Sequence, residues 1–592
     1  MIKRLLIPGA FLATLAAMAL TTALATSQQY DPTNDWGIDV GFVITVDSKG
    51  FELPTAIALV PQPGDDPDDP IYYVTELGGR VKVVTNDRSV HIFAEDVFEL
   101  KSKADLPITG SEVGLAGVCL DPRRGYVFVT FAYDDDGGVL RNNVVRFESN
   151  PGTFSIKPAG QLEFTEVFSA DESSPFQQIG PCQVDGDFLF VSVGDGKKPA
   201  FSQINDSTLG KVLRMTLDGR PITDNPFYID SNARNAANHV WAKGFRNPFG
   251  MKTLDGRVFV ADNGLNLDRF LEVQAGVNYL WDGSDFSIGA NATMVLSPSS
   301  GIAQMDRYPD GSTMFPEEYR QSFFLTTSGN LPWTKSSGTR RPPNILTLEY
   351  SLDDQMLLAT PKQFLRYQGG QVQVLVGLGF GPSGLYFVPL YPDKRGVNAV
   401  YRVTYQPSQV GSLNKSALEV MSHKGCFACH SLKGTGGLQG PPLDQEGLIS
   451  RVSNRLTSPE YRQNIDEIDQ LEHEPFSLYR DARSQILNSN GLVQVKTWLE
   501  YRIQEPRFDN TTAVMPNLDV SPEEAALVAE FLLTPPESEG FIDRWRNWVS
   551  KFFPNPSKRH LVYYFGAGFF LGGAASGLSY AVARILQRSR RV

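Results

Sequence analysis

Short hydrophobic stretches alternate with glycine- and proline-rich turns over residues 51–405. The stretches are rich in Val, Phe and Tyr, which favour β-strands. Six turn-and-strand units recur at roughly 55 to 80 residues, and they open at Leu53, Gly114, Gly180, Asn247, Gly301 and Gly379. In five of the units a second hydrophobic strand follows, at residues 71–74, 126–129, 188–191, 258–260 and 385–388.

This period predicts a six-bladed β-propeller over residues 40–405. Several strands per repeat are typical of propellers, whose blades close a ring and so protect the sheet edges. The alternative is a β-sandwich with irregular turns, which the length disfavours because sandwiches seldom run past ~250 residues.

After residue 405 the pattern becomes helical, which predicts a second, all-α domain over residues 411–536. Residues 414–423 carry an apolar stripe at helical spacing. A further helix is expected from Ser521 to Leu533, where Ser521 and Glu524 form a capping box and Pro522 occupies the first helical position.

The N-terminus has the pattern of a secretory signal peptide, predicted over residues 1–25. Lys3 and Arg4 precede an apolar run at residues 5–20, and small residues at 23 and 25 suit cleavage before Thr26. An uncleaved anchor is the alternative, although the apolar run is short for a membrane span. Either interpretation places the main body outside the cytoplasm, in a periplasm or its organellar counterpart.

Near the C-terminus, residues 561–585 form an apolar stretch long enough to cross a bilayer, which takes ~20 residues. The arginines that follow predict a cytoplasmic tail. Residues 541–553 are interpreted as an interfacial helix or, equally, as a packed surface helix. Glycines spaced four apart within the span suggest a partner transmembrane helix, at Gly568 and Gly572 and at Gly573 and Gly577.

Composition narrows the classes of partner. A chain of 592 residues is too long to fold around one hydrophobic core, which implies two or three domains. Its formal net charge of -12 leaves no basic surplus for a phosphate backbone, so a nucleic-acid partner is not expected.

The segment Cys426-Phe-Ala-Cys429-His430 carries the clearest chemistry. Two thiols at this spacing meet the two vinyl groups of one haem, and the following imidazole then binds the iron, so we predict covalent haem c. A zinc site would need further Cys or His ligands, and only the distant His473 and His560 follow. A thioredoxin-type thiol pair would sit beside a βαβ pattern, which this region does not show.

Met515 is predicted as the second axial ligand, because no other methionine follows His430. A thioether ligand raises the reduction potential of a haem. His473 is the competing ligand, and a lone methionine is often plain core. Residues 412–533 resemble class I cytochrome c, whose Gly-Pro-x-Leu loop is matched by Gly440-Pro441-Pro442-Leu443. That resemblance implies that the Pro441 carbonyl accepts the Nδ1 proton of His430.

Three segments of the expected propeller resemble the glucose/sorbosone dehydrogenase family, six-bladed propellers that use pyrroloquinoline quinone (PQQ) and calcium. They are Val191-Ser-Val-Gly-Asp195 with Gly210-Lys-Val-Leu-Arg214, Gly244-Phe-Arg-Asn-Pro-Phe-Gly250, and Asp262-Asn-Gly264 running to Gly276-Val-Asn-Tyr279. The resemblance implies that Arg246 and Asn247 bind the quinone. It also implies that the carbonyls of Gly264 and Leu265 bind calcium. The alternative is that Arg246 and Asn247 only connect blades through backbone hydrogen bonds.

One departure from that family bears on catalysis. Where the family has His-x-Gly-Gly, this chain has Gln177-Gln178-Ile179-Gly180. An amide has no usable basicity near neutral pH and cannot take the proton of a substrate hydroxyl. The catalytic residue therefore stays unassigned, with Asp195 or Glu112 as possible replacements, since His91 and His239 lie outside the motif.

Cys119 and Cys182 lie near the starts of neighbouring units. A disulfide between them is sterically conceivable, but two small buried hydrophobic residues are the favoured interpretation.

Two main hypotheses follow for function. The first is a membrane-anchored dehydrogenase that oxidises a sugar or alcohol with PQQ and passes electrons through haem to the respiratory chain. The second is an electron carrier whose non-catalytic propeller is a docking platform. A calcium-dependent lactone hydrolase is a third, which would leave the haem without a role.

Overall fold

The computed structural model describes residues 30–534 apart from 99–112, 136, 150–152, 285–286, 288, 290, 298, 330–341, 410, 413–416 and 519. Contacts between Cα atoms divide the chain into two compact units, Met1–Asn414 and Lys415–Val592. The first unit is built from strands and the second from helices.

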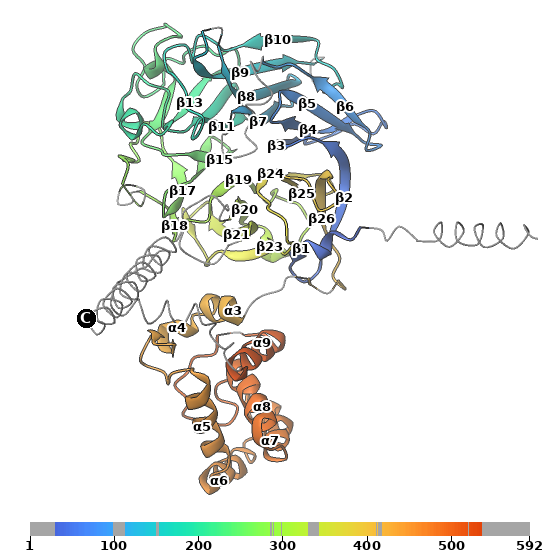
Figure 1. Cartoon of the computed structure of the whole chain (residues 1–592), viewed down its shortest axis with the longest axis vertical. Helices are drawn as coiled ribbons and strands as arrows, with labels where there is room; N and C mark the ends of the chain where they lie inside the picture. Colours follow the sequence, from blue (N-terminus) through green and yellow to red (C-terminus); the bar gives the residue numbers. More distant parts are fainter. Residues whose placement is uncertain are drawn as a thin grey trace, which may run out of the picture. The chain divides into compact units, whose positions relative to one another are not determined.

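The first unit is a six-bladed β-propeller (Figure 1), as the repeat predicted. Blade one holds β3 (Pro54–Leu59), β4 (Pro70–Glu76), β5 (Arg80–Thr85) and β6 (Val90–Ala94). Blade two holds β7 (Gly114–Asp121), β8 (Tyr126–Asp134), β9 (Leu140–Glu148) and β10 (Gly160–Glu163). Blade three holds β11 (Ile179–Asp185), β12 (Phe188–Val193), β13 (Lys211–Thr216) and β14 (Val240–Lys243). Blade four holds β15 (Pro248–Leu254), β16 (Arg257–Asp262), β17 (Asp268–Val273) and β18 (Met294–Leu296).

Blades five and six are completed by strands from the beginning of the chain. Blade five holds β19 (Ile302–Arg307), β20 (Ser322–Thr327), β21 (Asn344–Ser351), β22 (Met356–Leu357) and β23 (Lys362–Tyr367), and β1 (Trp36–Ile38) joins its edge. Blade six holds β24 (Leu375–Gly381), β25 (Gly384–Pro389) and β26 (Asn398–Tyr405), and β2 (Phe42–Phe51) pairs with β26. These additions close the ring and leave fewer open sheet edges.

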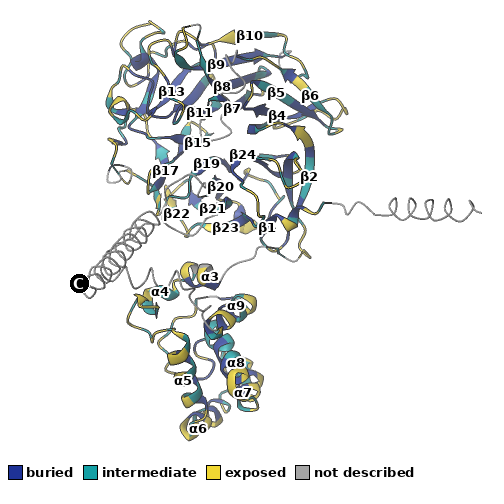
Figure 2. Ribbon diagram, in the orientation of Figure 1, coloured by how far each residue is buried: buried dark blue, intermediate teal, exposed yellow. Residues whose placement is uncertain are grey.

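The inner strands explain the repeated turn motifs of the sequence. Each motif begins or forms the innermost strand of one blade, namely β3, β7, β11, β15, β19 and β24, and each of these strands contacts the inner strand of the next blade. Most residues of these strands are buried (Figure 2), because neighbouring sheets cover both of their faces. Small residues at the motifs permit that approach: a Cβ at Gly250 of β15 would lie 2.0 Å from the carbonyl oxygen of Ala303 on β19.

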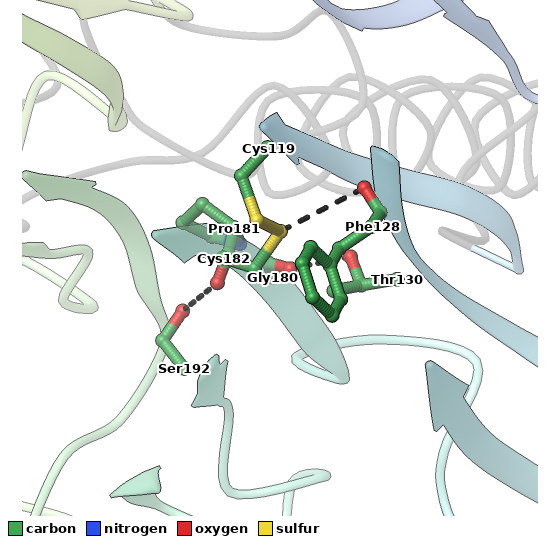
Figure 3. The surroundings of a disulfide bond; sticks show 7 residues. All are labelled: Cys119, Phe128, Thr130, Gly180, Pro181, Cys182 and Ser192. Atoms are coloured by element: carbon green, nitrogen blue, oxygen red, sulfur yellow. Dashed lines mark hydrogen bonds between the residues drawn. A yellow bond between two sulfur atoms is a disulfide. The ribbon is translucent and has the colours of Figure 1, made fainter. Parts of the chain in front are cut away.

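Cys119 and Cys182 form a disulfide between β7 and β11, so the interpretation as free buried residues was wrong. The inner strands of adjacent blades bring their Cα atoms to 5.7 Å, well within the reach of a disulfide. Figure 3 shows the bond beside Phe128, whose carbonyl oxygen lies 3.9 Å from the Cys182 sulfur. The Thr130 hydroxyl donates to the Gly180 carbonyl at 2.6 Å, which adds a second link between the same blades.

The second unit is helical. Its elements are α3 (Ala417–His423), α4 (Cys426–Cys429), the short pair β27 (Ser431–Leu432) and β28 (Thr435–Gly436), α5 (Gln445–Leu456), α6 (Pro459–Ile468), η6 (Ser477–Tyr479), α7 (Arg480–Leu487), α8 (Gly491–Gln504) and α9 (Pro522–Leu533). The predicted capping box at the start of α9 is confirmed, because Ser521 accepts the Glu524 N–H and Glu524 accepts the Ser521 N–H. Helices α3, α5, α8 and α9 share one apolar core, which includes Met421, Val452, Trp498 and Val528.

Three predicted segments lie outside the described residues: the signal peptide at 1–25, the interfacial helix at 541–553 and the membrane span at 561–585. Within the part of the chain that the structure describes, no helix is long and apolar enough to cross a membrane.

Candidate functional site

The motifs of blades three and four meet at one end of those blades. In the register of blade three, Ile179, Val193, Lys211 and Lys243 lie across neighbouring strands at the same end. In blade four, Pro248, Asp262 and Arg269 likewise lie across neighbouring strands at one end of the sheet. The loops that leave these strand ends carry Gln177, Asp195, Arg246, Gly264 and Leu265, and we call them the blade-end loops. The fold thus gathers residues that are far apart in sequence.

Asp195 is a buried carboxylate in these loops. Its Oδ2 accepts the indole N–H of Trp281 at 2.7 Å, and its Oδ1 accepts the backbone N–H of Lys197 at 2.8 Å. Burial raises the pKa of Asp195, although these donors and the charge of Arg246 oppose the shift. A carboxylate with a raised pKa beside a cation is typical of functional sites, and it is also found in structural networks.

Arg246 and Asn247 are held by the carboxylate of Asp262. The backbone N–H of Asn247 donates to Asp262 Oδ1 at 2.7 Å. The guanidinium of Arg246 donates to the Asn263 carbonyl at 2.7 Å and remains partly exposed. Asp262 also forms an ion pair of 2.9 Å with Arg269, and both of these side chains are fully buried. The network fixes the backbone around Arg246, a residue that is partly exposed.

The predicted calcium segment is fixed by a second buried carboxylate. Asp268 accepts the N–H of Gly264 at 2.9 Å and the N–H of Ser300 at 2.6 Å. Gly264 is buried, whereas Leu265 is 57% exposed. Among the residues that the structure describes, no three His, Cys, Asp or Glu side chains form a metal cluster. Carbonyl ligation at Gly264 and Leu265 therefore stays a prediction.

Gln177 lies two residues before β11, at the blade end that also holds Asp195. It adopts a φ of 55°, which non-glycine residues seldom do, and is buried. Its side-chain oxygen lies 3.2 Å from the N–H of Lys197, the same group that donates to Asp195. Gln177 and Asp195 are thus neighbours, and their juxtaposition could not be read from the sequence.

The two histidines of the propeller do not join this site. His239 lies just before β14, at the opposite end of blade three, and donates from Nε2 to the Ala233 carbonyl at 3.0 Å. Burial lowers its pKa. His91 belongs to β6 in blade one, and Glu112 lies outside the described residues.

Lys211, part of the Gly210-Lys-Val-Leu-Arg214 motif, has a structural role. Its ammonium donates to the carbonyls of Leu209 at 2.6 Å and Phe201 at 2.8 Å, and so ties down the loop that follows β12. Burial lowers its pKa to about 7. Among the residues missed at the sequence level, Trp281 shows one weak signal, since it follows the end of the Gly276 to Tyr279 motif by two positions.

The family model for glucose/sorbosone dehydrogenase matches residues 52–303, which include β3 to β18 and therefore blades one to four. The propeller is similar to the glucose/sorbosone dehydrogenases. An uncharacterised Synechocystis protein is 26% identical over 323 residues, covering 49% of this chain and 72% of its own.

The names of one further relative and of one solved structure describe an activity. Quinoprotein glucose dehydrogenase B of Acinetobacter calcoaceticus is 25% identical over 240 residues, covering 36% of this chain and 48% of its own, so the match spans about half of that enzyme. A PQQ-bound aldose sugar dehydrogenase structure from Streptomyces coelicolor has 18% identity and a TM-score of 0.45, covering 62% of this chain and 99% of its own.

In the helical unit, the Cys-x-x-Cys-His segment has a geometry that fits a haem. Cys426 and Cys429 are free, partly buried and one turn apart on α4. Nδ1 of His430 lies 2.8 Å from the Pro441 carbonyl, which confirms the implied bond and makes Nδ1 the donor. In the neutral imidazole, Nε2 would then be the nitrogen available to a metal. A Cβ at Gly440 would lie 2.5 Å from the imidazole, so only glycine permits this packing.

Met515 lies in the loop between α8 and α9 and is partly buried. Its neighbour Val514 is 97% exposed, and Leu438, in the segment that follows β28, is 89% exposed. The competing ligand His473 is exposed in the segment before η6, where its ring packs edge-on against Phe476. The roles of Met515 and His473 toward iron stay predictions.

Proposed function

We propose that this chain is a quinohaemoprotein dehydrogenase, in which the propeller oxidises a sugar or another alcohol and the helical unit carries the electrons away. The observation that carries the proposal is that one chain joins a glucose/sorbosone dehydrogenase-like propeller to a free Cys-x-x-Cys-His segment with an oriented imidazole. When a propeller of this class and a haem attachment segment occur in one chain, the simplest function that uses both is electron transfer from the propeller to the haem.

The donor set at the blade ends fits an acidic quinone. Arg246 supplies a cation, Asn247 an amide, and Gly264 and Leu265 supply carbonyls of the hard oxygen type that calcium prefers. When bound, PQQ would accept hydride from the substrate carbon, and haem iron would take the electrons one at a time. Asp262 and Asp268 keep the loops that bear these groups in place.

The protein must also remove the proton of the substrate hydroxyl. Gln177 cannot do so, and Asp195 is the nearest acid with a raised pKa, although it is only 1% exposed. We infer that oxidation is slow unless substrate binding opens a path to the Asp195 carboxylate. The alternative function, a non-catalytic propeller that serves as a docking platform, is favoured by the same glutamine.

In the helical unit the thiols of Cys426 and Cys429 would attach the haem, and His430 Nε2 and Met515 Sδ would bind its iron. The Cys119–Cys182 disulfide supports an oxidising compartment for the propeller. This agrees with the predicted export signal and with a main body in the periplasm or its counterpart. The span at 561–585 would anchor the chain beside a respiratory-chain partner.

One experiment separates the two functions. The purified full chain, with its haem oxidised, is mixed with PQQ and calcium, and haem reduction is followed in the visible spectrum as aldoses are added. A dehydrogenase reduces haem only when PQQ, calcium and sugar are all present. A docking platform leaves the haem oxidised under every combination, although dithionite still reduces it.

A further inference from the structure

Helices α6 and α7, which lie between α5 and α8, both contact two residues that follow α8, Phe508 and Asp509. Both are fully buried. They immediately precede residues 510–520, the loop that carries Met515. We call Phe508 and Asp509 the base of that loop.

The carboxylate of Asp509 is held from helix α8. Its Oδ2 accepts the indole N–H of Trp498 at 2.6 Å, and its Oδ1 pairs with the guanidinium of Arg502 at 3.0 Å. A second cation, Arg455 of α5, lies 3.6 Å from Oδ2. A buried carboxylate with this many donors is a strong anchor, because each hydrogen bond to a charged group contributes more than a neutral one.

The backbone of the same two residues is held from the other helices. Asn464 of α6 donates its side-chain N–H to the Asp509 carbonyl at 2.9 Å. Arg483 of α7, itself fully buried, donates to the Phe508 carbonyl at 2.8 Å and to the Phe476 carbonyl at 2.9 Å. Its charge is balanced by Asp469 at 2.5 Å. Helices α6 and α7 thus both hold the base of the loop.

Hydrogen bonds also hold the part of the loop that follows Met515. The side chain of Asn517 donates to Glu505, the residue after α8, at 2.9 Å. The capping box of α9 then fixes the chain at Ser521. Met515 therefore lies between two fixed points, of which Asp509 is the buried one.

We propose that Asp509 is a positioning residue that holds Met515 in reach of the haem iron, and that α6 and α7 serve to complete this anchor. The inference rests on the proposed haem function. A loop fixed at both ends loses little further freedom when its methionine binds, so ligation survives to temperatures near global unfolding. Loosening the Asp509 end lets the methionine dissociate while the helices stay folded.

The test compares two transitions in the full, haem-loaded chain: loss of the near-infrared sulfur-to-iron band and loss of helical circular dichroism on heating. In the wild type the two midpoints should nearly coincide. In Asp509→Asn the band should be lost about 5 °C or more below the helices. Asparagine can accept at only one of the two oxygen positions and leaves Arg502 and Arg455 without a counter-charge.

Trp498→Phe is a second variant in case Asp509→Asn does not fold, and it removes only the indole donor and part of the ring. Glu530→Gln is the matched control, since it breaks an exposed pair of 2.5 Å with Lys496 between α8 and α9. The control should keep the two midpoints together.

A merely structural Asp509 would lower both midpoints equally in both variants, and that result would overturn the inference. Covalent haem is checked independently from the spectrum of its alkaline pyridine complex. If haem is covalently attached but the wild type lacks the sulfur band, Met515 is not a ligand and the inference fails. If no covalent haem is present, the proposed function itself fails first.

Discussion

The two candidate redox sites differ in how the chain builds them. The candidate haem site uses the consecutive residues 426–430 and a carbonyl eleven positions further on. The propeller site draws Gln177, Asp195, Arg246 and Trp281 from separate loops of blades three and four. The geometry of a local motif is set by residues close together in the sequence. A site formed where blades meet depends on the fold of the whole propeller.

The largest expected effect concerns the candidate haem site. Replacing both thiols, Cys426→Ser and Cys429→Ser, should abolish covalent haem, because a hydroxyl does not form the thioether bond. The measurement is haem retained by the protein after denaturation in acidic acetone. Haem that stays attached in the double variant would show that these cysteines are not the attachment site.

Met515→Ala tests the predicted second axial ligand of the same site. Loss of the thioether should abolish the near-infrared band of the oxidised protein and lower the reduction potential, because a methionine ligand raises it. His473→Ala is the matched control and should leave both unchanged. A band lost in the His473 variant alone would transfer the ligand role to that residue.

Removing the disulfide tests whether the two units unfold independently. Cys119→Ala with Cys182→Ala should lower the free energy of unfolding of the propeller by about 2 to 4 kcal/mol, the usual contribution of a native disulfide. Urea unfolding followed by β-sheet circular dichroism reports the propeller, and haem absorbance reports the helical unit. Equal shifts in both signals would mean that the two units do not unfold independently.

Gln177→His tests the assembled site. Proton transfer by a positioned group contributes about 10²- to 10⁴-fold in rate, so imidazole at 177 should speed PQQ-dependent haem reduction at least ~10-fold. The neighbouring Asp195 carboxylate would orient the ring. Gln183→His, on the strand β11 that follows Gln177 but away from the blade end, is the control. A wild type that already turns over at tens per second would contradict the idea of a lost base.

The smallest effect concerns the charge of Asp195. Burial raises its pKa in the folded state, so between its unfolded and folded pKa values the native protein binds more protons. Its contribution is therefore fully present below the unfolded pKa and is lost as pH rises through the folded pKa. Relative to Asp195→Asn, the wild type should lose stability as pH rises, measured by urea midpoints across that range. An unchanged difference would show that Asp195 titrates normally.

The sequence predicted the propeller and the capped last helix because both depend on local patterns. The repeat marked all six inner strands, and Ser521 with Glu524 marked the start of α9. It did not predict the disulfide, since the pairing of Cys119 with Cys182 depends on the distance between two blades. Nor did it show that Asp195 lies beside Gln177, or that α6 and α7 hold the base of the Met515 loop.

The contrast also indicates which site tolerates change. The imidazole of His430 depends on one carbonyl and one glycine, so its environment is set within fifteen residues of the chain. Arg246 depends on Asp262, which in turn depends on buried Arg269. A substitution in any of several loops can therefore disable the propeller site while the haem site stays intact.

The most direct test of the central claim is whether substrate electrons reach the haem within one chain. The oxidised full-length protein, loaded with PQQ and calcium and freed of oxygen, is mixed with an aldose while the reduced haem band is followed. The account predicts slow reduction in the wild type, faster reduction in Gln177→His, and a rate independent of protein concentration. Haem that stays oxidised in both proteins, with no PQQ bound to either, would contradict it.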